Sequence, residues 1–233
     1  MFRKVLGILA VLSVGACASP YVATPYDRAS ANVESIVVAD DSVPEKAIAY
    51  EVASVGSNFG LIGALVDAGI QAERQDAVND ALVGIQFDAE DELEDRLVSA
   101  LGAQGYTVAP LPGPARAKRE FLKTYPTAPD GVDAYLDITL NYYGYMSSGA
   151  GQPFRPSVWA QVKLVKVADG STVMENQIVY NPLNVAEGVV TLPPNPEYAF
   201  NNRADLLADP TRLAAGIEDA LNQVADTAAQ LLR

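Results

Sequence analysis

DAYLDITLNYYGYM, residues 133–146, alternates apolar and polar side chains along most of its length. A period of two is typical of a β-strand with one buried face, and the β-branched and aromatic content favours the same structure. The predicted faces are Ala134, Leu136, Ile138, Leu140 and Tyr142 on the apolar side, and Tyr135, Asp137, Thr139, Asn141, Tyr143 and Tyr145 on the polar side. The stretch therefore predicts a half-buried strand with a tyrosine-rich outer face.

Two further strands follow this one. After a flexible connection at 147–156, Val158–Val167 again alternates, Asp169-Gly170 provides a hairpin turn, and Thr172–Tyr180 returns as the third strand. The sequence thus predicts an antiparallel three-strand meander. A loop rich in proline and asparagine, at 181–204, is longer than most connections in a compact domain.

The remaining elements lie on either side of the meander. Ser35–Ala39 (SIVVA) predicts a buried strand, and 45–53 a helical turn or two. Asp88 caps a helix with Leu93, Leu97, Val98 and Leu101 on one face, and 106–109 resumes an extended run. Residues 115–125 predict a short helix, and Asp209-Pro210 begins a final striped helix that reaches the C-terminus.

These elements indicate an α+β fold with an antiparallel or mixed sheet and helices packed on one face. Residues 35–233 are expected to form a single domain, with a small-residue-rich insertion at 54–82. Within the insertion, Gly56, Gly60 and Gly63 belong to a ridge of small residues that allows close backbone approach. The ridge either packs inside the protein or contacts a second copy, a partner or a membrane.

Composition excludes several classes of function. The chain has 16 Lys and Arg against 29 Asp and Glu, a formal net charge of −13, no histidine and one cysteine. An acidic protein repels nucleic acid, so no nucleic-acid partner is expected. Without histidine or a spare cysteine the usual nucleophile pairs and zinc sites are missing, so we expect no enzyme activity, no cofactor and no metal site.

Charged clusters and aromatic side chains are the remaining candidate sites. The basic residues Arg116, Lys118, Arg119 and Lys123 form either a solvated helix face or a docking patch for an acidic partner. Asp40-Asp41 is interpreted as a pair of turn residues in preference to a metal site or an acid–base pair. Tyr135, Tyr143, Tyr145 and Trp159 on the polar sheet face either pair across strands or line a ligand or partner surface.

The first residues carry a targeting pattern. Arg3 and Lys4 precede a short apolar run, and Val14-Gly15-Ala16-Cys17 follows it. These four residues resemble the lipobox of bacterial lipoproteins, which implies a signal peptide at 1–16 and acylation of Cys17, for example with palmitate. Residues 17–34 would then be an acylated tether, and Ala18 after the cysteine implies the periplasmic face of the outer membrane.

Five predicted elements follow one another: the strand SIVVA, the helix DELEDRLVSALG with GYTV, the strand from 133, the hairpin VADGSTVM and the last helix. Their order resembles that of a known domain. It is the α/β domain of periplasmic lipoproteins related to curli-secretion subunits and to activators of penicillin-binding proteins. The resemblance implies a lipid-anchored, non-catalytic adaptor or assembly component of the cell envelope, with an envelope protein or a second copy as partner. The alternative is a ligand-binding or transport-accessory lipoprotein that uses the aromatic sheet face and the 181–204 loop.

Substitution of Cys17 by serine tests the anchor. Because a hydroxyl group is not acylated in this pathway, Cys17→Ser should move the protein from the membrane fraction to the soluble fraction. Each buried methylene contributes about 0.8 kcal/mol to anchoring, so loss of the acyl chains should release the protein almost completely. Unchanged fractionation of the variant, measured by immunoblot, would contradict an anchor at this residue.

Overall fold

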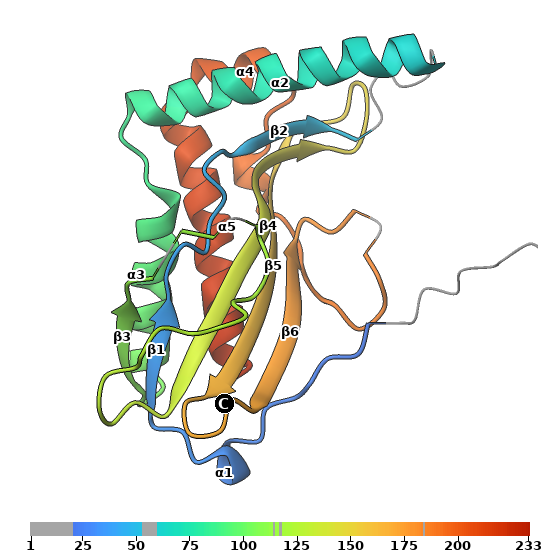
Figure 1. Cartoon of the computed structure of the whole chain (residues 1–233). Coiled ribbons are helices and arrows are strands. Elements are labelled where there is room, and N and C mark those ends of the chain that lie inside the picture. Colours follow the sequence, from blue (N-terminus) through green and yellow to red (C-terminus); the bar gives the residue numbers. More distant parts are fainter. Residues whose placement is uncertain (1–20, 53–59, 114, 117, 184) are drawn as a thin grey trace, which may run out of the picture.

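The computed structural model describes residues 21–233 except 53–59, 114, 117 and 184 (Figure 1). The expected signal peptide, Cys17 and Gly56 therefore lie outside the described residues.

A seven-stranded mixed sheet forms the centre of the protein. Its strands run in the order β3-β1-β4-β5-β6-β7, and β2 pairs with the end of β4. The pairs β4–β5 and β5–β6 are antiparallel, which confirms the predicted meander, and the other pairs are parallel. The bounds are β1 (Ser35–Ala39), β2 (Ile48–Glu51), β3 (Thr107–Leu111), β4 (Ala134–Ser147), β5 (Arg155–Lys166), β6 (Thr172–Tyr180) and β7 (Val190–Leu192).

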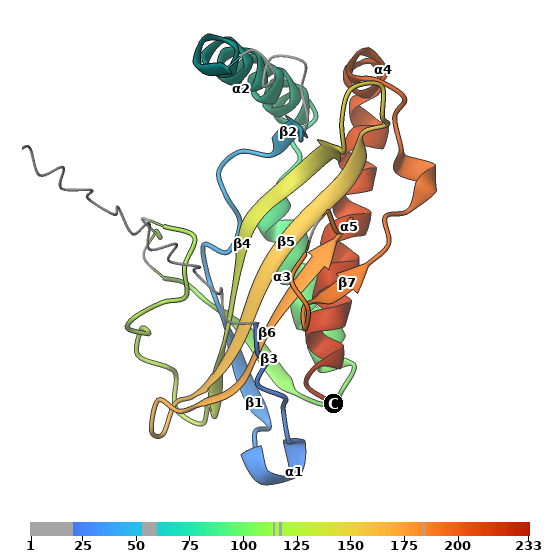
Figure 2. The same cartoon turned by 90° about the vertical axis from the view of Figure 1, so that its right-hand side faces the viewer.

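Two long helices, α3 (Ala89–Gly102) and α5 (Pro210–Gln230), cover one face of this sheet (Figure 2). Asp88 and Asp209 cap them by accepting hydrogen bonds from backbone N–H groups of the first turn, as predicted. The α+β class with helices packed on one face is thus confirmed. The other helices are α1 (Arg28–Ala31), α2 (Gly60–Gly84), the 3-10 turn η2 (Pro196–Tyr198) and α4 (Arg203–Ala208).

The main core lies between the sheet and these two helices. Leu93, Leu97 and Leu101 of α3 are buried. The apolar stripe along α5 is buried as well, and it consists of Leu213, Ile217, Leu221 and Val224. Burial of each large aliphatic side chain contributes roughly 1.5–3 kcal/mol. The apolar positions of β4 from Ala134 to Leu140 face this core, as their alternation predicts.

Helix α2 lies across the end of the sheet, above β2 (Figure 1). Val78 and Leu82 of α2 are buried in the main core, and the Asn79 side chain bonds both the N–H and the carbonyl of Ala47 at 2.9 Å. These bonds fix the C-terminal half of α2 to the chain entering β2. Gly60 and Gly63 lie in its first turn.

Two predicted helical segments have other structures. Residues 48–51 form β2, because pairing with β4 and burial of Ala47 and Ala49 outweigh local helix propensity. The described residues of 115–125 form no helix. There the side chain of Arg116 is drawn inward to a buried carboxylate, which breaks the solvated basic face that a helix would present.

A β-bulge changes which tyrosines of β4 face the core. Leu140 pairs with Ala160 and Tyr142 with Trp159, so Asn141 is an extra residue that shifts the alternation. Tyr143 and Tyr145 consequently lie in the main core with 6% and 0% exposure. The prediction that they share an outer face with Trp159 is wrong, and Tyr142 takes their place.

The folded body begins before Ser35. Thr24 forms an antiparallel bridge with Glu175 of β6, Asp27 caps α1, and Ala31 and Val33 are buried. Residues 24–34, which the sequence assigns to the tether, therefore pack on the domain.

Gly144 is required where β2 meets β4. Its φ is +131°, and an added Cβ would lie 2.2 Å from the carbonyl oxygen of Ile48. Gly144→Ala should therefore separate β2 from β4 and lower the free energy of unfolding by roughly 2 kcal/mol or more. Gly102→Ala is the control, because open space surrounds that helical position. Equal unfolding midpoints of the two variants in urea would contradict the close approach.

Candidate functional site

The outer face of the sheet, opposite α3 and α5, divides into two halves. Residues 112–132, here called the strap, cross the half formed by β1 and the first part of β4 (Figure 2). The half beside β2 is left without the strap. A binding surface on the outer face therefore lies on this second half or at the border between the two halves.

A buried ion pair holds the strap in place. Nη1 of Arg116 lies 2.6 Å from Oδ1 of Asp137, and the two side chains are 2% and 0% exposed. Nε and Nη2 of Arg116 also donate to the carbonyl of Asp40 at 3.1 and 3.0 Å. All three nitrogens of the guanidinium thus donate hydrogen bonds, which fits its fixed planar set of donors.

The second carboxylate oxygen of Asp137 bonds the strap as well. It accepts from the Leu122 N–H at 2.8 Å and from the Tyr125 hydroxyl at 2.9 Å. Burial and the Asp137 charge raise the pKa of Tyr125, so this hydroxyl stays a donor. The Tyr125 ring stacks on Tyr135 with centroids 4.6 Å apart, which closes a small second core on the outer face.

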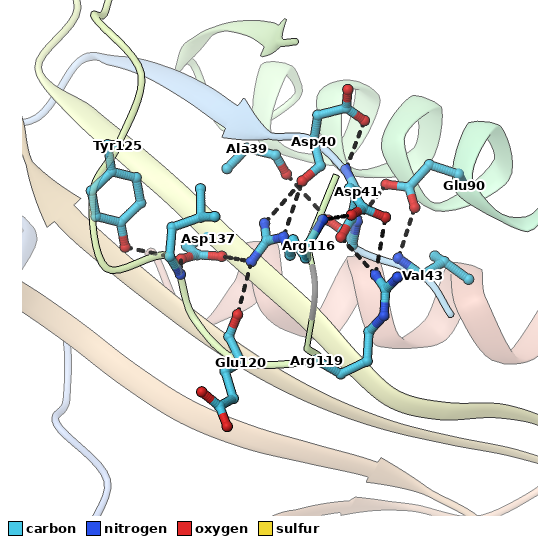
Figure 3. A network of polar contacts seen from close by, with 12 residues as sticks. Ala39, Asp40, Asp41, Val43, Glu90, Arg116, Arg119, Glu120, Tyr125 and Asp137 are labelled. Atoms are coloured by element: carbon cyan, nitrogen blue, oxygen red, sulfur yellow. Dashed lines mark hydrogen bonds and ion pairs between the residues drawn. The ribbon is translucent and has the colours of Figure 1, made fainter. Parts of the chain in front are cut away.

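Acidic side chains gather at the end of β1 (Figure 3). Arg119 bonds the carbonyl and the carboxylate of Asp41 at 2.9 and 3.1 Å, and Glu90 of α3 accepts from the N–H groups of Ser42 and Val43. Burial is the main cause that raises the pKa of Glu90. These residues border a cavity of about 430 Å³, but each contact drawn in Figure 3 closes a turn or fastens the strap. The geometry fits the interpretation of Asp40-Asp41 as turn residues.

Apolar side chains occupy the open half of the outer face. Ile48 and Tyr50 of β2 are register partners of Gly144 and Met146, and Ala49 between them is buried against the helix side. By this alternation Ile48, Tyr50 and Met146 share the outer face. Tyr50 is 43% exposed, and Val52, two residues further on, is 40% exposed. We call Ile48, Tyr50, Val52 and Met146 the β2 patch.

Next to the open half, the 181–189 loop covers an apolar cavity of about 230 Å³. Tyr142 and Trp159 lie on its sheet side, with ring centroids 6.0 Å apart and planes at 83°. The full lining is Tyr142, Trp159, Gln177, Val179, Leu183, Val185, Ala186 and Val189. The predicted aromatic surface thus exists around Trp159, although Tyr142 replaces Tyr143 and Tyr145.

The basic cluster and β2 differ from what the sequence predicts. The sequence predicts that Arg116 and Lys118 share a solvated face or a docking patch, yet Arg116 is interior while Lys118 is exposed. The sequence predicts a helical turn or two at 45–53, the segment that contains Tyr50 and Val52, whereas the structure has β2 there. The alternation of Ala47 and Ala49 with Ile48 and Tyr50 is a strand signal that could have identified this patch.

No family model and no curated protein matches this sequence. Among solved structures, a protein of the DUF330 family from Xanthomonas campestris is 19% identical, with a TM-score of 0.37 over 60% of this chain and 58% of that chain. The PelC dodecamer from Paraburkholderia phytofirmans is 10% identical, with a TM-score of 0.33 over 89% of each chain. The chain thus spans less than two thirds of the DUF330 protein. At these TM-scores neither likeness supports a conclusion about this chain.

Within the described ranges, none of the helices combines the length and the apolar character that crossing a membrane requires.

Neutralising Arg116 tests the strap. Arg116→Met leaves the Asp137 charge buried without its partner, and such a change costs about 3–5 kcal/mol. Lys118→Met makes the same chemical change at an exposed strap position and should be nearly silent. Chemical denaturation of both variants checks the difference in stability. In limited proteolysis, the strap of the Arg116→Met variant should be cut faster than that of the Lys118→Met variant. Equal stability of the two variants would show that the ion pair does not fasten the strap.

Proposed function

We propose that this protein is a non-catalytic, lipid-anchored component of the cell envelope that acts by contacting another protein through the β2 patch. The lipobox-like residues Val14-Gly15-Ala16-Cys17 support the anchor, with the body in the periplasm at the outer membrane. The acidic composition supports lipid over charge as the means of membrane attachment, because anionic headgroups repel a protein of net charge −13.

The observation that carries the proposal is the exposure of Tyr50 on β2 and of Val52 directly after this strand. Isolated apolar residues on a surface are ordinary, but here Tyr50 of β2, which is the register partner of Met146, and Val52, directly after the strand, are both exposed. Because Asn79 of α2 already bonds the backbone of Ala47, the contact is expected to use these apolar side chains and not added strand pairing. Tyrosine also suits a contact surface because its ring packs while its hydroxyl remains hydrated.

The two ends of the chain segment that carries this patch are held firmly. Asn79 fixes the backbone at Ala47, and Arg74 of α2 forms an ion pair with Glu51 at 3.3 Å. The N–H of Val52 also bonds the carbonyl of Ser147 at 2.9 Å. A preformed surface loses little conformational entropy on binding, which favours a specific contact.

The expected partner is an envelope protein or a second copy of this chain. For the adaptor function, the partner has to reach a patch on the outer sheet face, while the lipid holds the N-terminal segment at the membrane. Thr24 pairs with Glu175 of β6, whereas the patch lies on β2 and the end of β4. The patch thus stays separate from the attachment point of the tether.

Site-specific photocrosslinking in intact cells tests this function. A photoreactive amino acid at Tyr50 should give a discrete adduct with one envelope protein, or an adduct of twice the chain mass. The same group at Asp95, an exposed position of α3 on the opposite side of the sheet, is the matched control. Val52→Glu should reduce the Tyr50 adduct at least ten-fold, because burying an unpaired charge in a contact costs several kcal/mol. Identical background labelling from Tyr50 and Asp95 would refute the contact.

A further inference from the structure

The cavity between Trp159 and the 181–189 loop has the form of a preformed binding site. Its floor is the outer face of the meander, since Tyr142, Trp159 and Val179 are register neighbours on β4, β5 and β6. Its roof contains the aliphatic side chains of Leu183, Val185, Ala186 and Val189. An enclosed space between a rigid sheet and a covering loop is a usual position for a small-molecule site.

The roof is fixed at both ends. Nδ2 of Asn181 donates to Oγ of Ser157 at 2.7 Å, and the Asn181 N–H bonds the carbonyl of Leu192 at 3.0 Å. Gly188 has φ of +91°, and a Cβ there would lie 2.8 Å from the carbonyl oxygen of Tyr21. The loop is therefore pressed against the N-terminal segment and held over the cavity by its own anchors.

Trp159, which lines this cavity, carries an unused hydrogen-bond donor. Nε1 of Trp159 is shielded from solvent and has no acceptor among the described residues. An indole N–H can only donate, and a buried donor normally has a partner. The unused donor indicates that an acceptor belongs beside Trp159.

The lining also defines the chemistry of that acceptor. The eight described lining residues are uncharged, so a charged ligand would be buried among them without a counter-ion at high cost. A dry apolar cavity of about 150 Å³ accommodates benzene, so 230 Å³ accommodates one ring with a short substituent. We propose that this cavity binds a small, uncharged, largely apolar molecule with a single hydrogen-bond acceptor, which receives the Trp159 N–H.

This binding is separate from the proposed protein contact, because the cavity is lined by β4–β6 and the roof loop and not by the β2 patch. Binding of a partner to the patch and binding of a ligand under the loop can therefore be tested independently. Either one can fail without the other.

Acetophenone and ethylbenzene are matched probes for the cavity, because they have nearly the same size and differ by a carbonyl group. Trp159 is the single tryptophan of the chain, so one indole N–H resonance reports on it directly. In ¹H–¹⁵N spectra of the full chain carrying Cys17→Ser, acetophenone should shift this resonance downfield and bind about five-fold more tightly than ethylbenzene, as one hydrogen bond implies.

Two variants complete the test by calorimetry. Trp159→Phe retains a ring but has no donor, so the two probes should bind equally. Ala186→Leu fills the cavity from the roof and should weaken both probes at least ten-fold, while Lys118→Met at an exposed strap position should leave both unchanged. An indole resonance that moves with neither probe, equal binding of the two probes by the Cys17→Ser chain, or unchanged binding by a folded Ala186→Leu variant would each overturn the proposal.

Discussion

The ion pair between Arg116 and Asp137 is the interaction on which the organisation of the outer face depends. Asp137 lies in the first part of β4 with no solvent exposure, so its charge requires a partner brought to it. That partner arrives on the strap, together with the Leu122 N–H and the Tyr125 hydroxyl. One buried carboxylate thus decides that half of the sheet is covered by 112–132.

The other half of the outer face takes its form from two irregularities in β4. The bulge at Asn141 turns Tyr143 and Tyr145 into the helix-covered core and presents Tyr142 outward beside Trp159. Three residues later, Gly144 allows the backbone of Ile48 to approach and β2 to join the sheet. Without the first, the apolar cavity would lose its sheet-side tyrosine, and without the second, the β2 patch would have no strand to carry it.

The two candidate surfaces therefore share a physical origin but differ in chemistry. The β2 patch consists of partly exposed apolar side chains on a fixed backbone, which suits association with another chain. The cavity under the 181–189 loop is enclosed and uncharged, and its unused indole donor suits a small molecule. Both lie on the side of the sheet that α3 and α5 leave free, as expected where the helices of an α+β fold are confined to one face.

The sequence by itself determined the meander, the capped helices α3 and α5, and the lipobox-like pattern at Cys17, because periodicity, capping residues and targeting signals are local properties. It also indicated that Trp159 and the 181–204 loop belong to one surface. Only the tertiary structure decided that Arg116 is interior, that 48–51 is a strand and that Tyr142 faces outward. Each of these depends on a partner distant in the chain: the Asp137 carboxylate, the Gly144 backbone and the register of β5. Such pairings override local propensity because burying a matched group is worth more than the small preference of any single residue for helix or strand.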